Sequence, residues 1–107
     1  MRVYISGPVT KDKNYYEKFL SAEKRLKEAG YEVINPAKIA TLLPKSFEYG
    51  DYMDIDLNLL KKCDAIYLLK NWKNSLGAVI EQKLAKELGL KIIYQVSKNE
   101  RIEVLEK

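Results

Sequence analysis

A helix start and a carboxylate that lie close together in the sequence are the first groups that could do chemistry. Residues 77–88 carry apolar side chains at helical spacing, and Asn74 or Ser75 is suited to cap that helix. The free N–H groups of a helix start, next to Gly77, can bind an anion. Glu81 follows about one turn, or about 6 Å, further along the axis, where the helix dipole favours its ionised form. The pattern predicts an anion-binding turn beside a charged carboxylate.

Other acids and a tyrosine lie in distant parts of the sequence. Tyr4 falls in the first apolar run, and Asp54 and Asp56 lie on a predicted helix ahead of the turn. Each acid also has a structural interpretation: the aspartates fit as first-turn residues that complement a helix dipole, and Glu81 fits as a solvated helix residue. The local pattern alone leaves both interpretations open.

Aromatic residues flank the same region. The chain has eight tyrosines and only two phenylalanines, and tyrosines could stack against a base. The four that flank the predicted crevice are Tyr15, Tyr16, Tyr49 and Tyr52. Trp72, just ahead of the turn, is expected to form a wall of the pocket or a contact at its rim.

Composition excludes several kinds of chemistry. The 107 residues include no histidine, which removes the commonest proton shuttle at neutral pH and any histidine-based metal site. Cys63 stands alone, so it cannot form an internal disulfide, and we expect it to be a small buried residue. The net charge of +4 suits an anionic ligand, but the lysines are scattered over helix faces, so nucleic acid is not the expected partner. The absence of a long apolar run or a signal-peptide pattern leads us to expect a cytoplasmic protein with no membrane partner.

Alternating strands and helices must position these groups. Strands are predicted at residues 2–6, 31–34, 64–69 and 90–96, and helices at 14–29, 37–43, 51–62 and 77–88. The last of these strands is typical of a central strand, and residues 46–50 are expected to form a loop over the crevice. The alternation predicts one parallel α/β domain over residues 1–107, with 97–107 as an edge strand or a subunit-contact arm. A ligand would lie at the carboxyl ends of the strands, although neither loop there has a dinucleotide or triphosphate fingerprint.

Several short motifs occur in an order that is specific when taken together. They are Tyr4-Ile5-Ser6-Gly7-Pro8, Asn35-Pro36-Ala37, Asp56 with Leu60 and Cys63-Asp64, and Trp72-x-x-Ser75-x-Gly77-Ala78-x-x-Glu81. With this set, residues 1 to about 95 resemble the nucleoside 2-deoxyribosyltransferase superfamily, above all its small bacterial and phage branch. The resemblance implies a single-domain, three-layer flavodoxin/Rossmann-like sandwich with a four- to five-stranded, mainly parallel sheet.

The resemblance also implies catalytic roles. Glu81 matches the glutamate that attacks the anomeric carbon of a 2-deoxyribosyl group and forms a glycosyl-enzyme intermediate. Tyr4 matches a tyrosine that hydrogen-bonds this glutamate, and Asp56 matches an aspartate that acts near the leaving base.

One position separates the branches of the superfamily. Transferases of unphosphorylated nucleosides carry an aspartate six residues before the nucleophile, whereas Ser75 stands there in this chain and resembles the nucleotide hydrolases. A serine at a helix start donates to a phosphate, while an aspartate would repel it. Ser6, Gly7 and Lys11 are expected to complete the phosphate cradle together with Ser75 and Gly77. The hydrolases tend to place an arginine in the first loop, and here Lys11 is the nearest substitute.

The sequence therefore leads us to expect hydrolysis of the N-glycosidic bond of a (deoxy)nucleoside 5′-monophosphate. A nucleoside 2-deoxyribosyltransferase and a non-catalytic nucleotide-binding or sensor module are the alternatives. The expected partners are a small-molecule nucleotide and further copies of the chain, in a homodimer or a higher homo-oligomer. We expect no cofactor and no metal.

Overall fold

The apolar runs of the sequence form one parallel sheet. In the computed structural model, which describes residues 1–96, the strands are β1 (Arg2–Ser6), β2 (Glu32–Ile34), β3 (Ala65–Leu68) and β4 (Lys91–Tyr94). Their order across the sheet is β2-β1-β3-β4, and all three neighbouring pairs are parallel. The predicted parallel α/β fold is confirmed.

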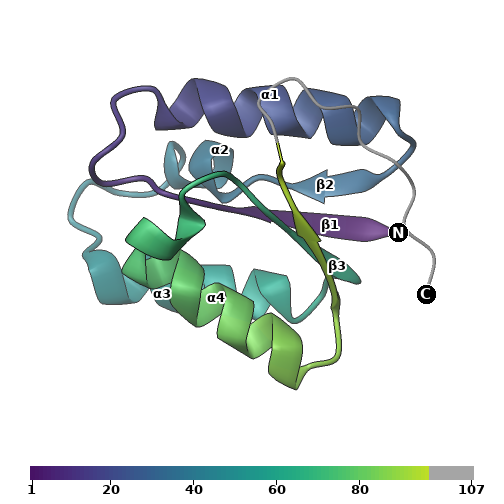
Figure 1. Ribbon diagram of the computed structural model, residues 1–107. Helices are drawn as coiled ribbons and strands as arrows, with labels where there is room; N and C mark the ends of the chain where they lie inside the picture. Colours follow the sequence, from purple (N-terminus) through teal and green to yellow (C-terminus); the bar gives the residue numbers. More distant parts are fainter. Residues whose placement is uncertain (97–107) are drawn as a thin grey trace.

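Helices cover both faces of this sheet, as Figure 1 shows. They are α1 (Tyr15–Glu28), α2 (Pro36–Ala40), α3 (Tyr49–Leu60) and α4 (Leu76–Glu87), with a short 3-10 helix η1 (Trp72–Asn74) ahead of α4. Helices α1 and α2 lie on one face, and α3 and α4 lie on the other. The three layers of the predicted sandwich are therefore present.

Alternation along β1 assigns its side chains to two separate cores. Val3 and Ile5 pack with Phe19 on the α1 face, within the larger hydrophobic cluster. Tyr4 belongs to the cluster on the opposite face, beneath α3 and α4. Ser6 lies two residues further along the same strand, so it points to the same side as Tyr4.

Glycines fix the ends of two of the three long crossover helices, α1 and α4. Gly30 follows α1 at φ 96° and Gly89 follows α4 at φ 73°, both in the left-handed region that favours glycine. At the end of α1, the N–H of Gly30 donates to the carbonyl of Lys27 and the N–H of Tyr31 to that of Leu26. These two bonds form a Schellman motif, and α4 ends with the same pattern. The predicted stops at Gly30 and Gly89 are confirmed.

Two structural expectations are corrected. The strand at residues 91–94 is one of the two outer strands of the described sheet rather than a central one, because one edge of it has no partner within residues 1–96. The segment 46–50 is only partly a loop, because α3 begins at Tyr49. The residue before it, Glu48, is the N-cap, and its N–H donates to the Asp51 carboxylate at 2.8 Å. The predicted tail strand or arm at 97–107 lies outside the described residues, and the single-domain boundary stays a prediction.

Candidate active site

An open cleft of about 1140 Å³ lies at the carboxyl ends of β1 and β3. The chain leaves β1 toward β2 on one side and leaves β3 toward β4 on the other. Ligands of open α/β sheets bind at such a switch in strand order. All eight residues that the sequence predicted for the site line this cleft: Tyr4, Ser6, Gly7, Lys11, Asp56, Ser75, Gly77 and Glu81. Their roles stay predictions, but the fold does bring them together.

Glu81 is buried in the wall of the cleft, with 6% of its surface exposed. The hydroxyl of Tyr4 donates a hydrogen bond to its Oε2, and the hydroxyl of Ser6 donates to its Oε1 at 2.6 Å. Both donors stand on the same side of β1, opposite the second turn of α4. The two bonds fix the orientation of the carboxylate and leave further lone pairs on both oxygens.

Burial decides the charge state of Glu81. Removal from water raises its pKa to about 7, helped by the nearby charge of Asp56 and opposed by the hydrogen bonds from Ser6 and Tyr4. The sequence predicted that the helix dipole would keep Glu81 ionised. Its raised pKa shows that burial affects the carboxylate more strongly than the dipole does. Desolvation outweighs the dipole because the side chain points into the protein and not into solvent.

Asp56 is the second acid of the cleft. It projects from α3, and burial raises its pKa to about 6. Asp54, two residues away on the same helix, is exposed and does not line the cleft. The pKa of Tyr4 is raised well above its usual range by burial first and then by the charges of Glu81 and Asp56, so its phenol stays a hydrogen-bond donor. The site thus holds two carboxyl groups with pKa values near neutrality.

The start of α4 has the geometry of an anion site. Ser75, not Asn74, is the N-cap, and its Oγ accepts from the N–H of Ala78 at 3.2 Å. The N–H groups of Leu76 and Gly77 have no acceptor inside the helix, as at every helix start. A Cβ built on Gly77 would lie 3.4 Å from Met53 Sδ, an ordinary contact. Gly77 thus leaves space in the cleft but is not required there by packing.

The loop after β1 brings positive charge to the same cleft. Lys11 and Lys13 both line it, and Lys13 is a residue that the sequence reasoning missed, although it stands in the same loop. Asp12 also lines the cleft, but the ammonium of Lys18 bonds its carboxylate at 2.6 Å. Since the second Asp12 oxygen accepts from the N–H of Asn14, the pair also orders the loop.

Gly7 is needed for a close approach. A Cβ on Gly7 would come within 2.8 Å of the Cβ of Leu69, so the ends of β1 and β3 could not lie this close with a larger residue. Asn71, which follows β3, adopts φ 65° and lines the cleft, and Thr41 lines it after α2. Neither Asn71 nor Thr41 was anticipated, because no local motif marks them.

The aromatic residues divide into two groups. Tyr15, Tyr49 and Tyr52 line the cleft as expected, whereas Tyr16 does not and instead packs edge-on against Tyr15 (6.4 Å between ring centres). Trp72 is not a wall of the cleft. Its ring packs against Tyr94 of β4 at 5.9 Å, with the cluster beneath α3 and α4. Trp72 therefore anchors η1 to the sheet.

Within residues 1–96, no three histidine, cysteine, aspartate or glutamate side chains are grouped as a metal site. In that part of the chain, no helix has both the length and the apolar character needed to cross a membrane.

Comparison with known proteins places the chain in a family. The model of a domain of unknown function, DUF4406, matches residues 1–94. The chain is a member of the DUF4406 family. No protein with a curated description matches it.

Two solved structures resemble this DUF4406 domain. One is a 2-deoxyribosyltransferase from Bacillus psychrosaccharolyticus, with a TM-score of 0.71 and 17% identity over 88% of this chain and 71% of that one. The other is the Clostridium botulinum CMP N-glycosidase BcmB, with a TM-score of 0.63 and 22% identity over 88% of this chain and 70% of that one. The DUF4406 domain therefore has the fold of the nucleoside 2-deoxyribosyltransferase superfamily, as its motifs indicated.

Proposed function

We propose that this DUF4406 domain hydrolyses the N-glycosidic bond of a (deoxy)nucleoside 5′-monophosphate, with Glu81 as the nucleophile. The observation that carries the proposal is the carboxylate of Glu81, which is buried in the wall of a large cleft and oriented by the hydroxyls of Tyr4 and Ser6. A buried acid with a strongly shifted pKa in a cleft is typical of a catalytic group. The likeness to a 2-deoxyribosyltransferase and a CMP N-glycosidase supports a reaction at a nucleoside or nucleotide.

The reaction proceeds in two displacements. The ionised Glu81 attacks C1′ of the sugar, the bond between C1′ and the base nitrogen breaks, and the base departs with the proton of Asp56. Water then attacks C1′ of the glycosyl ester, Asp56 takes a proton from that water, and the Glu81 carboxylate is released. The pKa of about 6 for Asp56 suits this exchange of a proton near neutral pH.

The phosphate belongs at the start of α4 in this proposal. Ser75 and the N–H groups of the first helical turn supply donors, and Lys11 with Lys13 supplies positive charge from the opposite loop. Asp12 is the carboxylate of that loop that would repel a phosphate, and its ion pair with Lys18 neutralises this charge. Gly7 lies beside this cradle, whereas the hydroxyl of Ser6 gives its one proton to Glu81 and therefore orients the nucleophile.

A transferase is the second candidate function. The 2-deoxyribosyltransferase of Bacillus psychrosaccharolyticus has the higher TM-score of the two neighbours, and transfer differs from hydrolysis only in the second acceptor. In that case a free base, not water, would take the sugar from Glu81. Saturable binding without turnover would instead indicate a nucleotide sensor.

The test is a panel of nucleoside and deoxynucleoside 5′-monophosphates, with and without a second free base. Free base plus sugar phosphate identifies a hydrolase, and a new nucleotide identifies a transferase. Glu81→Gln should bind the substrate but not turn it over, since it keeps the shape and removes the nucleophile. Turnover by this variant at the wild-type rate would refute the assigned role.

We also propose that the domain forms at least a homodimer. Leu76, Val79 and Ile80 form an apolar stripe on α4, with 68%, 37% and 37% of their surfaces exposed. Leu76 also lines the cleft, so a second copy packed there would cover its rim. Light scattering that gives a monomer mass at micromolar concentration would contradict this proposal.

A further inference from the structure

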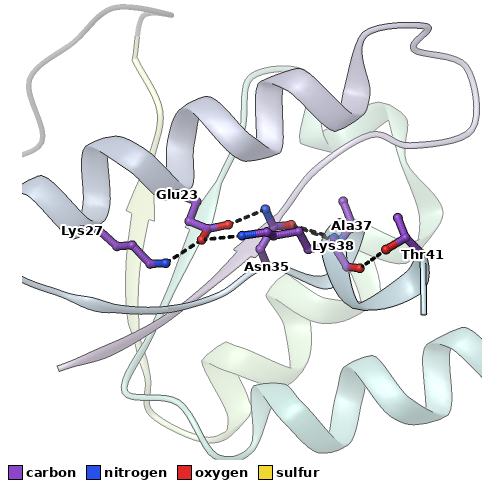
Figure 2. A network of polar contacts seen from close by, with 6 residues as sticks. All are labelled: Glu23, Lys27, Asn35, Ala37, Lys38 and Thr41. Atoms are coloured by element: carbon purple, nitrogen blue, oxygen red, sulfur yellow. Dashed lines mark hydrogen bonds and ion pairs between the residues drawn. The ribbon is translucent and has the colours of Figure 1, made fainter. Parts of the chain in front are cut away.

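A second buried carboxylate lies outside the proposed reaction. Glu23 of α1 has 7% of its surface exposed, although it is charged and does not line the cleft. Figure 2 shows that it points away from the solvent side of α1, toward Asn35 and Lys38. A buried carboxylate of this kind requires partners, because its isolated burial is costly.

The partners of Glu23 come from two different helices. Its Oε1 accepts from the side-chain amide of Asn35 at 2.9 Å, and its Oε2 pairs with Lys38 at 3.3 Å. Lys27, one turn along α1, pairs with the same Oε2 at 2.7 Å. Burial raises the pKa of Glu23, but the hydrogen bonds from Lys27, Asn35 and Lys38 lower it by more, so the net shift is downward. Glu23 therefore stays ionised in the folded protein.

Asn35 links this carboxylate to the start of α2. While its amide nitrogen donates to Glu23, its Oδ1 accepts from the N–H groups of Ala37 (3.0 Å) and Lys38 (3.3 Å). The other side of α2 faces the cleft, which Pro36, Ala37 and Ala40 help to line. A helix of five residues has little stability by itself, so its position depends on such contacts.

We propose that Glu23, Asn35 and Lys38 are positioning residues that hold α2 against α1 and thereby set the wall of the cleft that receives the substrate. The network touches no reacting atom and acts through the placement of Pro36, Ala37 and Ala40. Its effect on substrate binding rests on the proposed function, whereas its effect on α2 can be measured without any substrate.

The sharpest test exchanges the two ends of the central hydrogen bond. Asn35→Asp keeps an oxygen that caps α2 but places a second carboxylate against Glu23. Glu23→Gln removes the charge that Lys38 pairs with. The double variant Glu23→Gln/Asn35→Asp restores one amide donor facing one carboxylate, with the direction reversed. Lys27→Met is the matched control, because it removes an ion pair from the same carboxylate without involving α2.

Two measurements are made on all four variants. Hydrogen exchange over residues 36–41 should be about tenfold faster in Asn35→Asp, close to wild type in Lys27→Met, and largely restored in the double variant. With the best monophosphate substrate, Asn35→Asp should raise KM by about three- to tenfold with kcat within about twofold, and the double variant should recover most of this loss. If the variants acted only through a general loss of stability, the changes in exchange and in KM would instead follow the melting temperature in every variant, Lys27→Met included.

Each outcome decides one part of the inference. Unchanged exchange in Asn35→Asp, equal exchange in Lys27→Met, or no recovery in the double variant would overturn the role of the network in holding α2. Faster exchange with an unchanged KM would overturn its role in substrate recognition. If the wild type turns over no nucleotide, the proposed function fails, and the exchange pattern still tests the network.

Discussion

Replacing Tyr4 by phenylalanine should shift the ionisation of Glu81 upward. The phenol donates to Oε2 of the carboxylate, and a hydrogen bond to the charged form lowers a pKa. Tyr4→Phe removes this donor and leaves the ring in the core beneath α3 and α4. Since the pKa of Glu81 is already about 7 in the wild type, the change should carry it above neutrality.

The size of the shift follows from the strength of the bond. A hydrogen bond to a charged group contributes about 1.5–3 kcal/mol, which corresponds to about one to two pKa units. The pKa of Glu81 would then move from about 7 to about 8–9. At pH 7 the ionised fraction would fall from about one half to between about 10% and 1%, so kcat/KM should drop roughly five- to fiftyfold. The deficit should shrink as the pH is raised toward 9.

The assay measures kcat/KM of both proteins from pH 5 to pH 9 and follows their ratio, because the titration of Asp56 cancels in it. Carbon-13 NMR of glutamate side-chain carboxyls, with Glu81 assigned from Glu81→Gln, reports the pKa without any turnover. Tyr31→Phe is the control, since within residues 1–96 its buried hydroxyl has no hydrogen-bond partner. An unchanged or lowered Glu81 pKa in Tyr4→Phe would refute the reasoning.

Four further outcomes are expected. The pKa of Glu81 is about 7 in the folded protein and 4.5 in the unfolded chain, so the fold loses stability as the pH rises from 4.5 through 7. In denaturant unfolding, Glu81→Gln should therefore be about 3 kcal/mol more stable than wild type at pH 8 but little different at pH 4. Ser75→Asp should weaken binding of a monophosphate by about 1–3 kcal/mol more than binding of the matching nucleoside by calorimetry, and equal losses would show that the phosphate lies elsewhere. Gly7→Ala should lower the free energy of unfolding by about 1–3 kcal/mol, because its Cβ would lie 2.8 Å from the Cβ of Leu69; an unchanged melting temperature would contradict this contact. The wild-type kcat/KM should follow a bell with limbs near pH 6 and pH 7, and a profile flat from pH 5 to pH 9 would exclude Asp56 and Glu81 as the acid and the nucleophile.

The fold was predictable because its signals are local and agree with one another. Strand-length apolar runs alternate with helical patterns, and Gly30 and Gly89 end two helices with a backbone that glycine adopts readily. The position of β4 was not predictable in the same way. Its apolar run suggested a central strand. Both faces of β4 are covered, since Ile93 packs on the α1 face and Ile92 on the other, but one edge of β4 has no partner within residues 1–96. Such a run reports how both faces are covered and says little about the neighbours of the strand.

The site was predictable only in part. Residues that share a loop or a helix turn, such as Ser75 and Gly77, could be grouped by spacing, and the motif resemblance added Tyr4 and Asp56. The burial of Glu81 could not be inferred from the local pattern, because Tyr4 and Ser6 are 77 and 75 positions away in sequence. Their meeting depends on how α4 packs over β1 and β3, which is a tertiary property.

The relative pKa values of Glu81 and Asp56 affect how the domain would work. The proposed reaction needs Glu81 ionised and Asp56 protonated, yet the pKa of Glu81 (about 7) lies above that of Asp56 (about 6). The two groups titrate as a coupled pair, because the charge of Asp56 raises the pKa of Glu81, so protonation of Asp56 favours the ionised form of Glu81. A phosphate dianion bound beside Ser75 would raise both pKa values, but the donors there and the charges of Lys11 and Lys13 would offset it. The lysines of the first loop would then act on the protonation of the acids as well as on the affinity for the phosphate.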